Sequence, residues 1–278
     1  MNRKFSEIYS SSINNPEEFW KKISDDMFWF KKPTKILNRS NPPFYKWYED
    51  GVTNTCYNAL DVHIDQGRSN RAALIYDSPV TGNKNIFTYK ELRDKVSKFA
   101  GALQNQGVSK GDRVAIYMPM IPEAVIAMLA CGRIGAVHSV VFGGFASNEL
   151  ASRIDDSKAK VLITASCGFE PGRTVEYKPL VDEALKLASH KIDKLILFQR
   201  QGHEVILKAP KEISWEESLS NAKNVDCVEI KSNEYAYILY TSGTTGVPKG
   251  IVRDVGGHIA ALKWTMKNIY NIDQDDVW

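Results

Sequence analysis

The fold is decided by residues 235–250, which read "YAYILYTSGTTGVPKG". The apolar run "YAYILY" is typical of a buried strand, and the Ser/Thr/Gly-rich run after it has the composition of a flexible linker or of a ligand-binding loop. Residues 256–271 then have the periodicity of a helix. A loop between a strand and a helix lies at the carboxyl edge of an α/β sheet, where such sheets bind ligands. This position favours a binding loop over a linker.

Short apolar runs alternate with helix-period segments from about residue 72 onward. Thr88 and Glu91 have the spacing of a capping box, and Gly107 is placed to end the helix that they begin. The alternation predicts an α/β fold, with parallel sheets covered by helices on both faces and residues 235–240 as an inner strand. The predicted strands are 72–78, 113–119, 138–142, 160–166, 194–200 and 235–240, and the predicted helices are 88–107, 121–136, 146–157, 178–189 and 256–271.

The loop after residue 240 has the chemistry of an anion-binding site. Its glycines let a ligand approach backbone N–H groups, its hydroxyls add donors, and its lysine adds a positive charge. The candidate phosphate-binding residues are Thr241, Ser242, Gly243, Thr244, Thr245, Gly246 and Lys249. A Walker A loop does not fit, because Pro248 stands where its second glycine is needed and Gly250 replaces its Ser or Thr. For Lys249, a solvated lysine beside a turn is the alternative.

Composition and charge exclude several classes of protein. The 278 residues carry 36 Lys and Arg against 33 Asp and Glu, a formal net charge of +3, which does not favour a nucleic-acid or membrane partner. Four dispersed cysteines form no metal-binding motif with histidine, so we expect free thiols in a reducing compartment. Without a convincing leader or membrane span, the sequence predicts a cytoplasmic location, with the mitochondrial matrix as the alternative if the true N-terminus is missing.

Residues 1–60 are rich in Trp, Phe and Tyr interleaved with lysines. This pattern can bind single-stranded nucleic acid by stacking, but the acidic residues within it would repel phosphate. We therefore interpret residues 1–60 as an aromatic-rich N-terminal arm that packs onto the following domain. Gly143 and Gly144, which follow a predicted strand, are interpreted as packing residues.

Residues 240–250, "YTSGTTGVPKG", resemble the phosphate-binding signature of the adenylate-forming superfamily of AMP-dependent synthetases and ligases. Residues 139–165, 167–173 and 250–264 resemble short-chain acyl-CoA synthetases of the propionyl-CoA and acetyl-CoA type. The resemblance implies a two-step reaction, in which propionate or acetate attacks ATP to give an acyl-adenylate and pyrophosphate, and the thiol of coenzyme A then displaces AMP. Residues 241–246 would hold the pyrophosphate part of ATP with the help of Mg²⁺, and Lys249, the catalytic candidate, would steer the triphosphate.

The same resemblance assigns a second set of residues to coenzyme A. Glu170, Pro171, Gly172 and Arg173 resemble the segment that contacts the phosphates of coenzyme A. Many acetyl-CoA synthetases have arginine where Glu170 stands, so Arg173 is the expected phosphate partner. A structural surface arginine is the alternative.

The resemblance also implies how the chain is organised. Residues 61–278 would form an incomplete AMP-dependent synthetase/ligase N-terminal domain, because the adenine-contact motif, the ribose-binding aspartate and the C-terminal domain of the family are not found. We therefore expect a truncated short-chain acyl-CoA synthetase that does not complete the reaction alone and is poorly soluble. The alternative is a catalytically inactive module that binds nucleotide or coenzyme A or serves as an interaction surface. The acyl chain length is left open.

Overall fold

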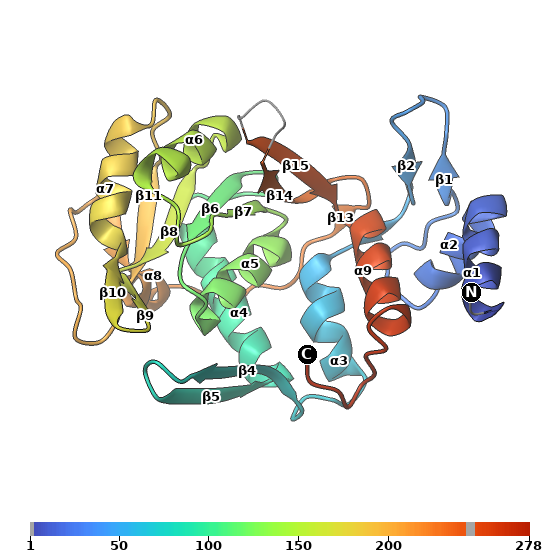
Figure 1. Ribbon diagram of the computed structural model, residues 1–278, viewed down its shortest axis with the longest axis horizontal. Coiled ribbons are helices and arrows are strands. Elements are labelled where there is room, and N and C mark those ends of the chain that lie inside the picture. Colours follow the sequence, from blue (N-terminus) through green and yellow to red (C-terminus); the bar gives the residue numbers. More distant parts are fainter. Residues whose placement is uncertain (1–2, 243–247) are drawn as a thin grey trace.

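The computed structural model describes residues 3–242 and 248–278, and within them a seven-stranded sheet forms the centre of the protein (Figure 1). The order of strands is β12-β11-β8-β6-β7-β14-β15, and every neighbouring pair is parallel except β14 and β15. The strands are β6 (Arg113–Tyr117), β7 (Val137–Val140), β8 (Val161–Ala165), β11 (Lys194–Phe198), β12 (Glu212–Ser214), β14 (Tyr235–Thr241) and β15 (Lys249–Asp254). The predicted α/β class with a mostly parallel sheet is confirmed.

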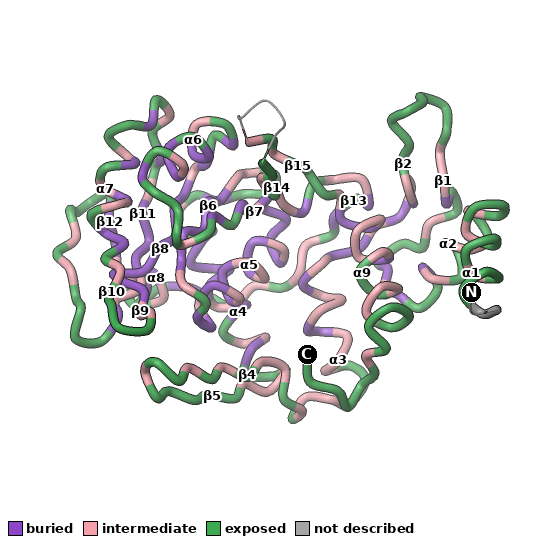
Figure 2. The backbone as a smooth tube through the Cα atoms, viewed as in Figure 1, coloured by how far each residue is buried: buried purple, intermediate pink, exposed green. Residues whose placement is uncertain are grey.

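Helices cover both faces of this sheet, so its central strands are buried on each side (Figure 2). The helices are α4 (Tyr89–Asn105), α5 (Pro122–Ile134), α6 (Ser147–Ser157), α7 (Tyr177–Leu187) and α8 (Trp215–Ser220). Because side chains alternate along a strand, Ile163 of β8 packs with α4, α5 and α8, whereas its neighbour Leu162 packs with α6 and α7. The two cores therefore share one layer of strands.

Smaller elements surround the central layers. Four two-stranded antiparallel pairs are β1 (Leu37–Asn38) with β2 (Lys46–Trp47), β3 (Val52–Thr53) with β13 (Ile230–Lys231), β4 (Ala72–Ser78) with β5 (Asn83–Thr88), and β9 (Cys167–Glu170) with β10 (Arg173–Glu176). The other helical elements are α1 (Arg3–Asn14), α2 (Pro16–Ser24), the π-helix η1 (Tyr57–Asp61), α3 (Val62–Asp65) and α9 (Gly256–Asn268). Among the residues that the structure describes, no helix combines the length and the apolar character needed to cross a membrane.

Helix α4 begins and ends as its sequence predicts. The backbone N–H of Glu91 donates to the Thr88 hydroxyl at 3.2 Å, and the backbone N–H of Thr88 donates to the Glu91 carboxylate at 2.8 Å. These two bonds are the capping box, which satisfies amide groups that the first turn leaves without partners. Gly107 follows the helix with φ 81°. The predicted limits of this helix are thus confirmed.

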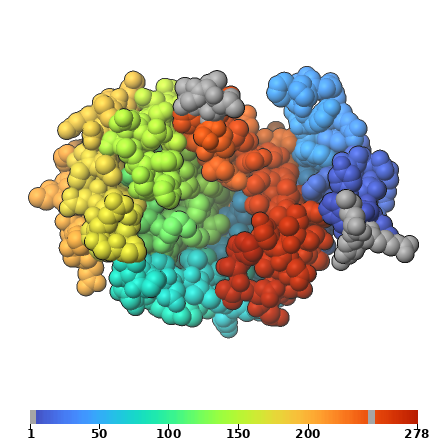
Figure 3. Space-filling view, viewed as in Figure 1, coloured from blue at the N-terminus to red at the C-terminus, as the bar shows by residue number. Residues whose placement is uncertain are grey.

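Some aromatic residues of the first 60 positions pack onto the rest of the chain, as predicted, whereas others, such as Tyr9 and Phe44, are exposed. Trp20 of α2 makes edge contacts with Trp47 and with Trp264 of α9, at ring-centroid distances of 5.9 and 6.4 Å. Figure 3 shows the C-terminal segment (red) between the N-terminal helices (blue) and the β4–β5 pair (teal). A domain boundary at residue 60 stays a prediction.

Three sequence expectations about strands are wrong. Residues 72–78 form β4, but this strand pairs only with β5 and lies outside the parallel sheet, because the short turn at Gly82 returns the chain at once. Residues 249–254 form β15 instead of a loop that leads to a helix, so the phosphate-loop sequence connects an antiparallel hairpin. Strand β14 is an inner strand between β7 and β15, as predicted, but Ala236 is its only buried residue. The reason is that the helices cover the centre of the sheet more completely than this end.

Two helical glycines give a matched test of the packing of α4. A Cβ on Gly101 of α4 would lie 1.9 Å from the carbonyl oxygen of Lys223, whereas a Cβ on Gly132 of α5 would meet nothing closer than 3.7 Å. Gly101→Ala must displace the segment after Lys223, which the Ser97 hydroxyl binds through Val225. We expect Gly101→Ala to lower the free energy of unfolding by about 2 kcal/mol.

For the control Gly132→Ala, we expect no loss or a gain of up to about 1 kcal/mol, because alanine favours the helix. Urea unfolding followed by circular dichroism measures both values. Equal stability of the two variants would contradict the close contact of α4 with residue 223.

Candidate functional site

The parallel strands bring several connecting segments to one edge of the sheet, here named the carboxyl edge. It is formed by the segments that follow β6, β7, β8 and β14. In open α/β sheets ligands bind at this edge, where the connecting segments are free to carry polar groups. Both predicted sets of site residues follow such strands: Thr241 ends β14, and Glu170 ends β9, which begins two residues after β8.

The described members of the first set lie at the end of the β14–β15 hairpin. Thr241 and Lys249 are paired across the two strands, and both are exposed, as is Ser242. Gly243, Thr244, Thr245 and Gly246 lie outside the described residues. A hydroxyl group and an ammonium group therefore stand opposite each other where the chain leaves the sheet.

Helix α6 fixes the base of this tip. The hydroxyl of Tyr240 donates to the carboxylate of Asp156 at 2.6 Å, and the guanidinium carbon of Arg153 lies 5.3 Å from the centre of the Tyr240 ring. Burial and the Asp156 carboxylate both raise the pKa of Tyr240, so its hydroxyl keeps its proton and acts as a donor. These two contacts join the hairpin to the helix that precedes β8.

The second set forms the turn of the β9–β10 hairpin. Pro171 and Gly172 occupy the turn, where Gly172 has φ 77°, and Glu170 is paired directly with Arg173. The Arg173 guanidinium contacts the Glu170 carboxylate through Nε at 2.7 Å and Nη2 at 2.6 Å. The side chains are 70% and 43% exposed, and an ion pair so accessible to water is weak. A phosphate group could therefore displace Glu170 from Arg173.

A pair of stacked tyrosines connects the segment after β7 to this second hairpin. The rings of Tyr117 and Tyr177 lie 4.9 Å apart, and the Tyr117 hydroxyl donates to the carbonyl of Phe145 at 2.7 Å. The Tyr177 hydroxyl is so close to Gly143 and Gly168 that added Cβ atoms would lie 2.0 and 3.1 Å from it. The packing interpretation of Gly143 is thus confirmed.

Exposed apolar residues on the carboxyl edge were not predicted from the sequence. Met120, after β6, is 88% exposed, and Phe142, after β7, is 69% exposed. Their position directly after apolar strands could have indicated them, because loops at such positions often carry function.

Arg200, after β11, was also not predicted. Its guanidinium carbon lies 4.7 Å from the centre of the Phe169 ring. These residues extend the candidate site along the edge.

The two predicted sets are not joined to each other. In the described part of the chain, no hydrogen bond or ion pair connects the tip residues Thr241, Ser242 and Lys249 with the Glu170–Arg173 turn. They are separate parts of one edge, divided by the strands β6 and β7. A ligand that used both would have to span those strands.

Comparison with known proteins agrees with this architecture. Residues 61–278 match the family model described as AMP-binding enzyme, and residues 5–59 match the model described as Acetyl-coenzyme A synthetase N-terminus. The chain therefore belongs to the AMP-binding enzyme family.

Individual relatives share most of this chain. The human protein named Acyl-CoA synthetase short-chain family member 3, mitochondrial, is 51% identical over 271 residues, which cover 97% of this chain and 40% of that protein. The Acetyl-coenzyme A synthetase of Streptomyces coelicolor is 42% identical over 276 residues, covering 98% and 42%. A solved structure, Acetoacetyl-CoA synthetase from Streptomyces lividans, has a TM-score of 0.86 at 25% identity and covers 96% of this chain and 40% of that chain. The chain thus spans about two fifths of the length of these relatives.

Two tyrosines on β14 test how α6 holds the hairpin. Tyr240→Phe removes the hydrogen bond to Asp156 but keeps the ring beside Arg153. We expect the free energy of unfolding to fall by about 1 kcal/mol, the usual net value of such a bond. In the control, Tyr235→Phe, the ring is 61% exposed, and we expect almost no change. Denaturant unfolding measures both, and an equal effect of the two changes would argue against the anchor.

Proposed function

We propose that this chain is part of a short-chain acyl-CoA synthetase, which joins a carboxylate such as propionate or acetate to coenzyme A through an acyl-adenylate formed from ATP. The supporting observation is the Ser/Thr/Gly-rich sequence with Lys249, carried by the β14–β15 hairpin at the carboxyl edge of a chain from this family. The names of its relatives support the same class of reaction.

Prepositioned donors are the main contribution that such a hairpin can make. A carboxylate is a poor electrophile, so it must be activated before a thiol can attack it. In the activating step, the carboxylate attacks the α-phosphate of ATP and extra negative charge develops on phosphate oxygens. The hydroxyls of Thr241 and Ser242, the ammonium of Lys249 and the loop residues 243–246 would bind those oxygens. Thr241 and Lys249 are exposed and paired across the hairpin, which suits them to meet the same phosphate chain.

Magnesium would reach the site with the nucleotide. The described tip residues offer hydroxyl groups and an ammonium group but no carboxylate, so they do not make a magnesium site of their own. When bound, Mg²⁺ would neutralise charge on the phosphate oxygens. The residues of this chain would orient the phosphate chain that carries it.

Coenzyme A is proposed for the β9–β10 turn. Arg173 offers a planar group that can make two hydrogen bonds to a phosphate, and its present partner is an exposed carboxylate that a doubly charged phosphate can replace. Met120 and Phe142 are exposed on neighbouring segments and could pack against apolar parts of the ligand. The name of the human relative, which includes the word mitochondrial, supports a mitochondrial rather than a cytoplasmic location.

A binding module without catalysis is the second candidate function. It would need only exposed groups that can bind phosphate, such as Lys249 and Arg173. Incubation with ATP, Mg²⁺, propionate and coenzyme A separates the two functions. Release of pyrophosphate together with propionyl-CoA supports the synthetase, whereas binding of ATP or coenzyme A without release supports the module.

Lys249 provides the test of the phosphate hairpin. We expect Lys249→Ala to weaken ATP binding by about tenfold or more, because a hydrogen bond to a charged group contributes roughly 1.5–3 kcal/mol. The control is Lys84→Ala on β5, an exposed lysine paired with Asp77 outside the central sheet. Titration calorimetry with MgATP measures both, and equal affinities of the two variants would refute the assignment.

Arg173 and Glu170 give a test with opposite signs. Arg173→Ala should weaken binding of coenzyme A by about tenfold, with ATP binding unchanged, because only the former uses this turn. Glu170→Gln keeps the shape but removes the competing charge, so it should strengthen coenzyme A binding by roughly two- to fivefold. Calorimetry with each ligand checks this, and a change in ATP affinity alone would show that the turn was wrongly assigned.

A further inference from the structure

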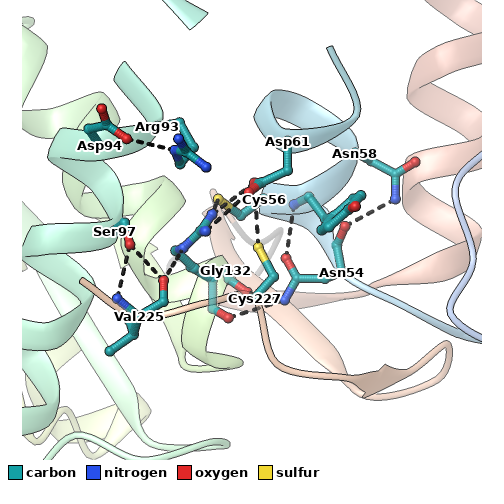
Figure 4. Close-up of polar contacts among 12 residues, drawn as sticks. Asn54, Cys56, Asn58, Asp61, Arg93, Asp94, Ser97, Gly132, Val225 and Cys227 are labelled. Atoms are coloured by element: carbon teal, nitrogen blue, oxygen red, sulfur yellow. Dashed lines mark hydrogen bonds and ion pairs between the residues drawn. The ribbon is translucent and has the colours of Figure 1, made fainter. Parts of the chain in front are cut away.

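A buried group of four side chains lies outside the carboxyl edge and is not used by the proposed function. We name it the thiol cluster; it consists of Cys56, Asp61, Arg133 and Cys227. Figure 4 labels its two cysteines and Asp61. Cys56 directly precedes η1 and Asp61 ends it, Arg133 lies near the end of α5, and Cys227 lies on the segment that leads to β13. Cys56 is completely buried, whereas Cys227 is partly exposed.

Hydrogen bonds to the backbone hold the three segments of the cluster together. The side-chain amide of Asn54 donates to the carbonyls of Gly132 and Val228 at 3.0 and 2.9 Å. Arg133 Nε donates to the carbonyl of Val225 at 2.6 Å, and the backbone N–H of Val228 donates to the Arg133 carbonyl at 2.9 Å. The pairing of β3 with β13 continues the same junction. The two cysteines therefore stand on backbone that is fixed on both sides.

The distances within the cluster bring the two sulfur atoms close to each other. Both Sγ atoms and an Asp61 carboxylate oxygen lie within 4.8 Å of one another. Arg133 Nη1 lies 3.5 Å from Cys56 Sγ, and the thiol of Cys227 lies 3.6 Å from the Asp61 carboxylate. A disulfide therefore requires the two sulfur atoms to approach each other by less than about 3 Å.

The charges of the cluster favour thiol chemistry over metal binding. The Arg133 guanidinium makes two bonds to the Asp61 carboxylate, at 2.8 and 3.1 Å, so a cation already occupies the only carboxylate of the group. A metal ion would have to displace that buried guanidinium and leave it without a partner, which is costly.

We propose that Cys56 and Cys227 are a redox-active dithiol, which a small-molecule disulfide such as oxidised glutathione converts to an intramolecular disulfide. The thiolate of the partly exposed Cys227 attacks one sulfur of the small disulfide, its S–S bond breaks, and one thiolate leaves. The thiolate of Cys56 then attacks Cys227 Sγ and releases the second small thiolate. Two protons pass from the protein thiols to the two released thiolates, so the protein pair is oxidised while the small disulfide is reduced.

The structure also indicates the rate and the consequence of this reaction. The hydrogen bond with Cys56, together with burial, raises the pKa of Cys227, so the first attack is slow at neutral pH and speeds up as pH rises. The bond would tie η1 to the segment before β13, which precedes the phosphate hairpin. Since Cys56 and Cys227 are 171 residues apart in sequence, the cross-link would restrict the unfolded chain strongly.

The test maps the disulfide in the intact chain. The protein is equilibrated in buffers of reduced and oxidised glutathione and then unfolded in denaturant with N-ethylmaleimide, so that buried free thiols are alkylated too, and peptides are identified by mass spectrometry. We expect a linked Cys56–Cys227 peptide, with Cys131 and Cys167 still alkylated, and a thermal midpoint raised by roughly 5–10 °C that dithiothreitol reverses.

Variants and competing outcomes make the test decisive. Cys227→Ser should abolish both the linked peptide and the shift in midpoint, whereas the control Cys167→Ser should retain both; if Cys227→Ser does not fold, the mapping in the unaltered chain stands alone. Absence of the linked peptide in the most oxidising buffer, pairing of Cys56 with Cys131, or a glutathione adduct on Cys227 that never closes would overturn the proposal. Protection of both thiols by equimolar Zn²⁺ in the reduced chain would also overturn it, in favour of a metal site.

Discussion

Strand β8 sets the constraint on which the rest of the fold depends. All five of its residues are buried, so none of its backbone amides can be satisfied by water. The partners are β6 on one side and β11 on the other, both parallel to β8. Parallel pairing requires crossover connections, and these are the helices that cover both faces. It also places the carboxyl ends of the strands on one edge, which is why the candidate site residues occur there.

A second constraint is the buried charge of Arg133. Burial opposes its charge, but the hydrogen bond to Asp61 and the electrostatic attraction of Cys227, Cys56 and Asp61 together outweigh burial and raise the pKa of Arg133, so it stays a cation. Such a pair adds little net stability compared with apolar packing, but removing either partner is costly. It therefore acts mainly to specify structure: α5, η1 and the segment before β13 can meet in only one arrangement. Because β13 leads into β14, this junction also determines where the phosphate hairpin starts.

The sequence predicted the parts of the fold that local patterns determine. The capping box of Thr88 and Glu91 and the five-residue apolar runs of the central strands depend on neighbours in sequence, and these elements are as expected. Strand β15 was missed because the connection between Thr241 and Lys249 is longer than the usual hairpin connection of about two to five residues. The partner of β4 was missed because periodicity reveals a strand but not the strand that pairs with it.

The candidate site shows the same division. The candidate residues of the β14–β15 hairpin and the β9–β10 turn could be proposed from the sequence because they are contiguous; their roles stay predictions. The ion pair between Glu170 and Arg173 could also have been predicted from the sequence. Opposite charges on either side of Pro171-Gly172 face each other in a two-residue hairpin. The thiol cluster could not be predicted, because Cys56 and Cys227 come together only through the tertiary fold. Distant pairs of this kind carry no local signal.

The β14–β15 hairpin, which carries the proposed phosphate-binding residues, is joined to the rest of the sheet by few contacts. Strand β15 is at the edge of the sheet, so the hairpin depends on β14, which pairs with β7 through only Tyr237–His138 and Ile238–Ser139. Burial lowers the pKa of His138 to about 4, so its imidazole is neutral and stacks on Tyr237 at 5.3 Å without adding charge. Most residues of β15 and several residues of β14 are exposed (Figure 2). The hydrogen bond from Tyr240 to Asp156 is therefore a principal restraint near the tip. The hairpin thus has few contacts with the core near its tip, which suits the proposed role of binding and releasing a phosphate chain.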